Sequence, residues 1–146
     1  MGGDLKVEGY ASVFWERDLN DDVAAKGAFK ESVERTGAAG VRMLYQHETR
    51  EPVGVWDHIA EDGRGLFVRG RILAASAQGR LAQALVRVGA LDGLSIGFRT
   101  VKARKDESGR LRVLTEVELW EVSLVTFPML PGARLRLADG AALAAA

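Results

Sequence analysis

The sequence predicts a mainly β (α+β) domain: a small, mostly antiparallel barrel flanked by short helices. Runs rich in Val, Ile, Tyr and Phe with partial alternation recur along the chain. Most of the connections between these runs are too short for a parallel crossover, and only a few segments show helical spacing. The 146 residues, 47% of them apolar, are enough for one domain with a substantial core.

Six strands are expected between segments of turn-forming residues. They cover residues 6–14, 41–47, 53–60, 66–73, 94–102 and 111–127. Turns are expected at residues 18–22, 61–63 and 105–109, where Asp, Asn and Gly gather. Pro128 and Pro131 end the last strand, because proline cannot donate to a sheet ladder.

Two short helices are expected. Residues 27–36 form the first, and Gly37 suits the left-handed position just past its end. The second runs to Val88, with Ser76 as its N-cap and Gly89 as its stop. Its predicted apolar stripe consists of Leu81, Leu85 and Val88.

Composition restricts the function classes. Twenty basic and twenty acidic residues cancel, so the chain lacks the charge of a dedicated nucleic-acid or membrane-surface binder. No cysteine is present, which excludes disulfides, thiolate metal sites and a cysteine nucleophile. With His47 and His58 as its only histidines, the chain is expected to bind no metal or cofactor.

The ends of the chain carry no targeting signal that we recognise. The N-terminus lacks the apolar core of a signal peptide, and no apolar run reaches the roughly 18 residues that a membrane helix needs. Residues 1–137 form the predicted domain. The alanine-rich residues 138–146 are expected to be a flexible C-terminal end.

Ser95 is the candidate nucleophile. It is the serine of a G-x-S-x-G pattern at residues 93–97, but a β-type run follows it where a hydrolase elbow would continue into a helix. Alternation places Ser95 and Gly97 on the face opposite Leu94 and Ile96, and the small Gly97 leaves open space above the hydroxyl. The alternative is an ordinary serine on a half-exposed strand.

His47 is the candidate base. It ends the strand predicted over residues 41–47 and shares a face with Val41, Met43 and Tyr45, so it should be partly buried at the rim of the core. A hydrogen-bonded structural histidine is the alternative. His58 is expected on the solvent side of its strand.

Glu121 is the candidate acid. It interrupts the otherwise apolar alternate positions of the strand predicted over residues 111–127, whereas Glu116 and Glu118 fall on the other, solvated face. A carboxylate among apolar side chains costs several kcal/mol unless it is paired. Either a neighbouring imidazole or one of the many arginines could pair with it.

A hydroxyl, an imidazole and a carboxylate together suit nucleophilic acyl transfer. The hydroxyl is too weak an acid to attack a carbonyl unaided, so a base must take its proton, and a third group must hold that base in the right tautomer. The chain offers one candidate of each type in the order His47, Ser95, Glu121. Their spacing alone does not show whether they meet.

Six blocks of sequence carry a family resemblance. They are residues 9–14 (GYASVF), 43–47 (MLYQH), 52–56 (PVGVW), 65–70 (GLFVRG), 91–98 (LDGLSIGF) and 119–128 (LWEVSLVTFP). On these blocks the chain resembles the prohead serine proteases of tailed bacteriophages, which also occur in prophages and gene transfer agents. The blocks are spread over roughly residues 5–135 and are far more specific than any single motif.

The resemblance implies a fold and a set of roles. The family is similar to the herpesvirus assemblins, whose fold is a seven-stranded, mainly antiparallel barrel surrounded by helices. It implies Ser95 as nucleophile and His47 as base. In the herpesvirus enzymes the third member is a histidine that follows the serine; no histidine follows Ser95 here, so Glu121 is the candidate instead. By analogy, backbone N–H groups near residues 129–132, or Arg134 acting through a water molecule, would bind the oxyanion.

The resemblance also implies a biological setting. Such proteases act inside the immature capsid, in the cytoplasm of the host or bacterium, where they cleave scaffold, the N-terminal segment of the major capsid protein, and themselves. Major capsid protein and scaffold are therefore the expected partners. Because the herpesvirus relatives are activated by dimerisation, a homo-oligomer is also considered, whereas no specific nucleic acid or membrane is expected.

Three competing functions stay open on the sequence. The first is a non-catalytic assembly module with the same fold that binds capsid protein, and the second is a small-molecule esterase that uses the same serine. The third is a barrel that binds single-stranded nucleic acid. The zero net charge and the lack of interleaved basic and aromatic residues count against the third.

Overall fold

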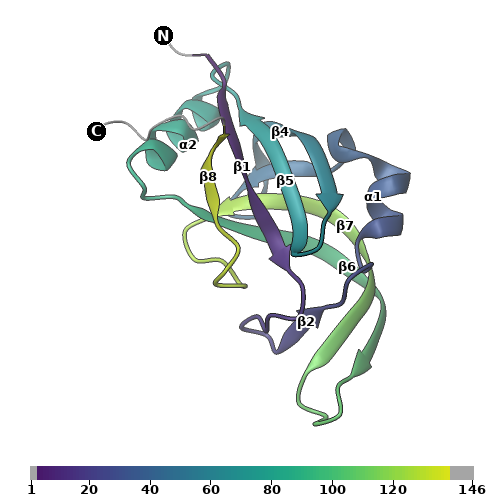
Figure 1. The fold of residues 1–146 in the computed structure, drawn as a ribbon. Helices are drawn as coiled ribbons and strands as arrows, with labels where there is room; N and C mark the ends of the chain where they lie inside the picture. The colour runs from purple at the N-terminus through teal and green to yellow at the C-terminus, as the bar shows by residue number, and fades with distance from the viewer. Residues whose placement is uncertain (1–2, 139–146) are drawn as a thin grey trace.

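The computed structural model describes residues 3–138, which form eight strands paired into one curled sheet (Figure 1). Across the sheet the order is β2-β7-β3-β4-β5-β1-β8, and β6 pairs with β7 outside that path. Within the described residues the pairings are antiparallel, except that β2 and β3 each run parallel to β7. The predicted mainly β, mostly antiparallel class is therefore confirmed. The strands are β1 (Leu5–Val13), β2 (Asp22–Ala24), β3 (Arg42–Tyr45), β4 (Glu48–Glu61), β5 (Gly65–Ile72), β6 (Gly93–Lys105), β7 (Arg112–Val125) and β8 (Leu135–Leu137).

Two strands of the described region were not predicted from the sequence, and both are three residues long. β2 lies where a turn was expected to end and pairs with the beginning of β7. β8 follows Pro131 and pairs with β1. Both lie at the ends of the strand order, and such short edge strands offer too few residues for alternation to be recognised.

β6 and β7 form a long antiparallel hairpin whose turn end projects from the body of the sheet (Figure 1). Trp120 is an extra residue on β7, because Gly97 pairs with Glu121 while Phe98 pairs with Leu119. This bulge changes the face on which the later residues lie. The prediction of one continuous apolar face over residues 111–127 is therefore wrong, and Phe127 is 88% exposed. The buried residues on β7 include Val117 and Leu119 before the bulge and Val122 and Leu124 after it.

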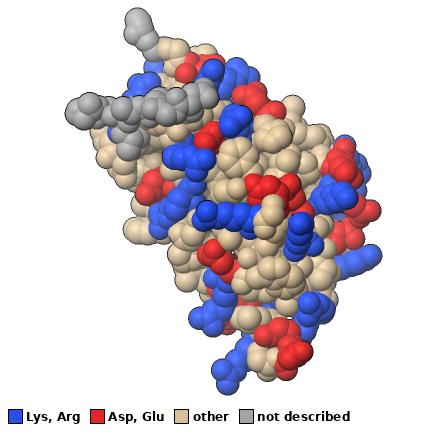
Figure 2. Space-filling model, in the orientation of Figure 1, with Lys and Arg blue, Asp and Glu red and all other residues tan. Residues whose placement is uncertain are grey.

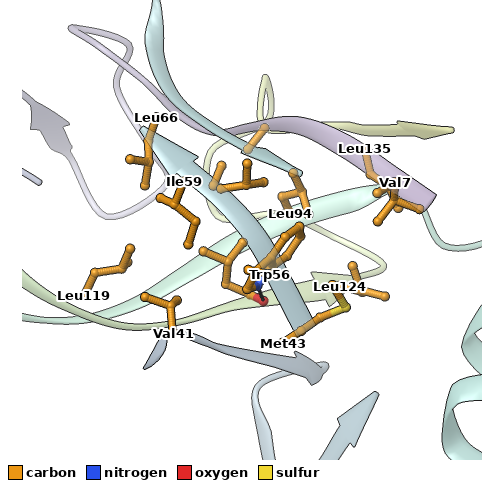
Figure 3. Packing of buried hydrophobic residues seen from close by; sticks show 14 of the residues in the cluster. Val7, Val41, Met43, Trp56, Ile59, Leu66, Leu94, Leu119, Leu124 and Leu135 are labelled. Carbon is orange, nitrogen blue, oxygen red and sulfur yellow. Dashed lines mark hydrogen bonds between the residues drawn. The ribbon is translucent and has the colours of Figure 1, made fainter. Parts of the chain in front are cut away.

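The core is centred on Trp56 of β4 (Figure 3). Its Nε1 donates to the carbonyl oxygen of Val122 at 3.2 Å, which satisfies the one polar group that the buried indole carries. The side chains around it come from strands far apart in the sequence and are buried: Val7, Val41, Met43, Ile59, Leu66, Leu94, Leu119 and Leu124. The packing of β6 and β7 against β3 and β4 through this core determines where the polar residues on these strands lie relative to one another.

Helices α1 (Lys30–Thr36) and α2 (Ala77–Arg87) lie outside the sheet (Figure 1). α1 begins three residues later than the predicted start at residue 27, and a single 3-10 turn, η1 (Ala38–Gly40), follows it among the described residues. Gly37 has the expected positive φ of 75°, but its ψ of 161° is extended, not left-handed helical.

α2 begins as predicted, since the Ser76 Oγ accepts the backbone N–H of Gly79 at 3.0 Å. Its predicted apolar stripe is wrong, because Leu81 and Val88 are exposed. A Cβ at Gly79 would collide with the carbonyl oxygen of Leu73, so at this position the helix lies too close to the preceding loop for any side chain. The residues buried on it are Gly79, Ala82, Gln83 and Val86.

Charged side chains of both signs are interspersed over the face shown in Figure 2. One carboxylate, Glu8, is buried and joins three strands: it accepts from Arg69 of β5 at 3.0 Å and from Arg136 of β8 at 2.7 Å. Burial opposes the ionisation of Glu8, but the two guanidinium groups outweigh it and hold its pKa below the ordinary value. This network ties the edge strand β8 to β1 and β5.

Ala138, the first residue of the end predicted to be flexible, is 2% exposed. The rest of that end, residues 139–146, lies outside the described residues. None of the described helices is long and apolar enough to cross a membrane.

Candidate functional site

The turn between β3 and β4 presents His47. Tyr45 pairs with Glu48, so Gln46 and His47 are the central residues of the turn, and both have positive φ, 54° and 61°. Positive φ at both central positions is the geometry of a type I′ hairpin turn. His47 is therefore not the last residue of a strand, as predicted, but projects from the turn, and its side chain is 42% exposed.

His47 is hydrogen-bonded to Glu121. Its Nδ1 lies 2.8 Å from the carboxylate Oε2, and the Glu121 side chain is only 14% exposed. The hydrogen bond raises the pKa of His47 above its ordinary value, partial burial opposes this, and the negative charge of Glu121 adds to the rise. The imidazole thus satisfies the half-buried carboxylate, which was the first of the two pairings that the sequence left open.

Glu121 is held by its own strand and by the neighbouring one. The hydroxyl of Ser123, which is fully buried on the same strand, donates to the carboxylate Oε1. Across the hairpin, Gly97 lies opposite Glu121, and a Cβ at Gly97 would overlap the Glu121 carboxyl group. The place that a side chain at Gly97 would take is therefore occupied by the Glu121 carboxylate.

Gly97→Ala is expected to lower the free energy of unfolding by about 1–3 kcal/mol, the usual cost of overpacking. It should also lower the pKa of His47 toward about 6.5, because the added methyl group displaces the Glu121 carboxylate from the ring. Thermal unfolding and NMR titration of the His47 ring measure the two effects.

Gly63→Ala is the matched control, because a Cβ at Gly63 meets nothing within 4 Å. It should change neither quantity. If Gly97→Ala leaves both the stability and the His47 titration at their wild-type values, the placement of Glu121 against β6 is contradicted.

Ser95 lies on β6 directly opposite Ser123 and is 7% exposed. It lines a cavity of about 150 Å³ together with His47, and the walls of that cavity include Leu94, Met129 and Leu130. A second hollow, lined in part by Gln46, Val125 and Phe127, also has Ser95 and His47 in its walls. Ser95 and His47 line the same cavity, but among the described residues no hydrogen bond joins the Ser95 hydroxyl to the His47 ring.

The other predicted candidates lie apart from this cavity or have other partners. His58 on β4 is exposed, as expected, and lies against the ring of Phe67. Glu118 is hydrogen-bonded to Trp120 and Arg99. Arg134, an oxyanion candidate, donates to Asp92 and to the carbonyl of Pro131.

Sequence reasoning missed three residues of the site. Ser123 stands two positions after Glu121 and therefore on the same face, which is the signal that could have identified it. Gly97 was noted for its small size but not for the carboxylate that fills its place. Gln46 is hydrogen-bonded to Thr126 beyond the end of β7, and no local pattern indicates that contact.

The chemistry available here is that of a protonatable ring between a carboxylate and a cavity lined by a hydroxyl. Among residues 3–138 there is no group of three or more His, Cys, Asp or Glu side chains that could hold a metal ion.

Comparison with known proteins shows which families and folds the chain is similar to. Residues 2–143 match the family described as caudovirus prohead serine protease. The chain is 37% identical over 123 residues to the prohead protease of Enterobacteria phage HK97, covering 83% of this chain and 54% of the relative. It is 30% identical over 127 residues to the prohead protease of Escherichia phage T5, covering 86% and 59%. The chain thus spans little more than half the length of these relatives.

Solved structures share the fold at low sequence identity. The capsid assembly protease of bacteriophage T4 aligns with a TM-score of 0.65 at 16% identity, over 84% of this chain and 82% of that one. The KSHV protease in complex with a hexapeptide phosphonate inhibitor aligns with a TM-score of 0.61 at 18% identity, over 90% and 63%. These likenesses show an assemblin-like fold.

Proposed function

Because the chain belongs to the caudovirus prohead serine protease family, we propose that it is a serine endopeptidase with Ser95 as nucleophile, His47 as general base and Glu121 as the group that orients the base. The observation that carries this assignment is the His47–Glu121 hydrogen bond at 2.8 Å on a ring that shares its cavity with Ser95. Ser123 is the other serine near the ring, but it is fully buried and already donates to Glu121.

The proposed reaction is acyl transfer in two stages. The Nε2 of His47, which Glu121 leaves free, takes the proton from the Ser95 hydroxyl as Oγ bonds to the scissile carbonyl carbon. The protonated ring then gives that proton to the departing amine as the C–N bond breaks. In the second stage His47 takes a proton from water, which attacks the acyl carbon, and the Ser95 Oγ leaves with a proton returned by the ring.

Glu121 supports both stages through the His47 ring. With its Nδ1–H donated to the carboxylate, the neutral ring presents an unprotonated Nε2 toward the cavity. When the ring takes up a proton, the nearby negative charge stabilises the imidazolium. The Ser123 hydroxyl and the absence of a side chain at Gly97 hold the carboxylate in place for this role.

The backbone N–H groups of Met129 and Leu130 are the proposed oxyanion donors. Both residues line the cavity beside Ser95. In the part of the chain that the structure describes, neither N–H donates to another group, so both are available to a developing oxyanion. Arg134 is the weaker candidate, because its guanidinium is already bound to Asp92 and Pro131.

The proposed substrates are the scaffold and the N-terminal segment of the major capsid protein, together with the protease itself, cut inside the immature capsid. The family description and the prohead proteases of HK97 and T5 support this substrate class.

The test is cleavage of the cognate capsid protein and scaffold by the full-length protease. We expect a shortened capsid protein with one new N-terminus, which sequencing of the product identifies, and fragments of the scaffold. Hydrolysis of nitrophenyl esters without cleavage of either protein would indicate an esterase instead. Binding of capsid protein without any hydrolysis would indicate an assembly module.

The rate of acylation is expected to rise with pH and level off above the pKa of His47, because only the neutral ring accepts the Ser95 proton. The hydrogen bond to Glu121 raises that pKa, burial opposes the rise, and the Glu121 charge reinforces it, so the midpoint should lie above about 6.5. The pH profile of kcat/KM for a peptide substrate measures it. A midpoint below the ordinary histidine value would contradict an ionised Glu121 at the ring.

A further inference from the structure

The turn that carries His47 has an unfavourable sequence for its backbone. Both central residues of a type I′ turn need positive φ, and Asn-Gly or Asp-Gly are preferred there. This chain has Gln46 and His47 instead, at φ of 54° and 61°. A residue other than glycine rarely has positive φ, and Gln is not among the types enriched there, as Asn, Asp and His are, so contacts outside the turn must hold Gln46 in this conformation.

Gln46 makes those contacts, and all of them reach the end of β7. Its backbone N–H donates to the carbonyl of Leu124 at 2.8 Å. Its side-chain Nε2 donates to the Thr126 Oγ1 at 2.6 Å, and its Oε1 accepts the backbone N–H of Thr126 at 3.1 Å. The amide is thus bound on both of its polar atoms to one residue, which fixes its position and its direction.

The same strand carries Glu121. The Gln46 bonds to Leu124 and Thr126 therefore fix the turn relative to the strand that supplies the carboxylate, and His47, the next residue, reaches that carboxylate. We propose that Gln46 is a positioning residue, whose amide clamp on Thr126 holds the His47 ring in register with Glu121 and with the cavity that Ser95 lines. The kinetic consequences of this inference rest on the proposed function.

A structural role alone does not explain the choice of residue. Gln46 and Thr126 are exposed, where side-chain hydrogen bonds add little net stability. Glycine or asparagine at position 46 would suit the turn better. A residue that is unfavourable for the local backbone, yet bound on both polar atoms of its side chain, is the pattern expected where geometry matters more than stability.

Gln46→Gly and Gln46→Asn separate a role in stability from a role in positioning. Both residues suit positive φ, but glycine has no side chain and the asparagine side chain is too short to reach Thr126. We expect both variants to unfold at or above the wild-type temperature. At the same time kcat for peptide cleavage should fall by about ten- to a hundredfold, as for other small displacements of catalytic groups, with KM little changed. Wild-type kcat in both variants would overturn the proposal. A rise in KM at constant kcat would overturn it too, by showing that Gln46 contacts substrate.

The partner side of the clamp supplies matched variants. Thr126→Val removes the Oγ1 acceptor at nearly constant volume, and Thr126→Ser keeps it. We expect Thr126→Val to lower kcat, whereas Thr126→Ser should retain most of the wild-type kcat. The double variant Gln46→Gly with Thr126→Val should be no slower than Gln46→Gly alone, because the two substitutions remove the same hydrogen bond. Additive losses would overturn the clamp.

NMR titration of the His47 ring tests the inference without relying on catalysis. Loss of the clamp should let the ring leave Glu121, so its pKa should fall toward about 6.5 in Gln46→Gly, while Gln46→Gly in a Glu121→Gln background should cause no further fall. An unchanged titration in Gln46→Gly would overturn the positioning role. If the wild-type protein showed no peptidase activity, the proposed function would fail while this titration still decided the role of Gln46.

Discussion

Ser95→Ala is expected to reduce peptide cleavage by at least about 10⁴-fold, since loss of the nucleophile in serine proteases costs at least that much. The substitution removes the Ser95 Oγ, the atom that forms the acyl-enzyme in the proposed reaction. The fold should persist, because Ser95 makes no side-chain hydrogen bond in the described part of the chain. Cleavage of capsid protein, with thermal unfolding as the check on the fold, measures the effect.

Ser123→Ala is the informative companion, because Ser123 lies directly opposite Ser95 across the hairpin. Its hydroxyl supports the Glu121 carboxylate, so we expect a partial loss of rate but continued acyl-enzyme formation at Ser95. If Ser95→Ala cleaved at the wild-type rate while Ser123→Ala did not cleave at all, the nucleophile would have to be reassigned.

Glu121→Gln is expected to lower kcat by about 10³- to 10⁴-fold, in line with the loss of the carboxylate in other triads. The amide is nearly the same size, but it does not stabilise the imidazolium and allows the ring to adopt the wrong tautomer. The pKa of His47 should fall as well, because the hydrogen bond and charge that raise it are both altered. Steady-state kinetics and ring titration on the same variant measure the two effects.

Glu118→Gln is the matched control for that variant. Glu118 lies on the same strand, yet it binds Trp120 and Arg99 on the exposed part of the hairpin, and exposed pairs contribute about 1 kcal/mol or less. We expect kcat within about twofold of wild type. Equal losses in the two variants would mean that neither carboxylate is specifically coupled to the ring.

The sequence predicted the larger elements of the fold because their signals are local. Ser76 caps α2 as expected, and the long strands follow alternating apolar residues. The failures came from tertiary structure: Leu81 was placed on the buried face of α2, but the face that packs against the protein is the one with Gly79, Ala82, Gln83 and Val86, and Leu81 is exposed. The short strands β2 and β8 depend on partners distant in sequence, which no local pattern indicates.

For the site, residue types were easier to predict than positions. The carboxylate at Glu121 was identified because it interrupts an apolar register, although the bulge at Trp120 breaks that register just before it. The strand expected over residues 41–47 ends early because Gln46 and His47 turn the chain, which leaves the ring at the surface. The bulge and the turn are determined by pairing with β6 and β4, so the sequence of either segment alone does not show them.

A crystal structure of the full-length protease treated with a peptide phosphonate tests the central assignment most directly. We predict a covalent bond from phosphorus to the Ser95 Oγ, with His47 Nε2 within about 3 Å of that oxygen and Glu121 still bound to Nδ1. Attachment of the phosphonate to another side chain, or a His47 ring turned away from the adduct, would contradict the proposed catalytic site.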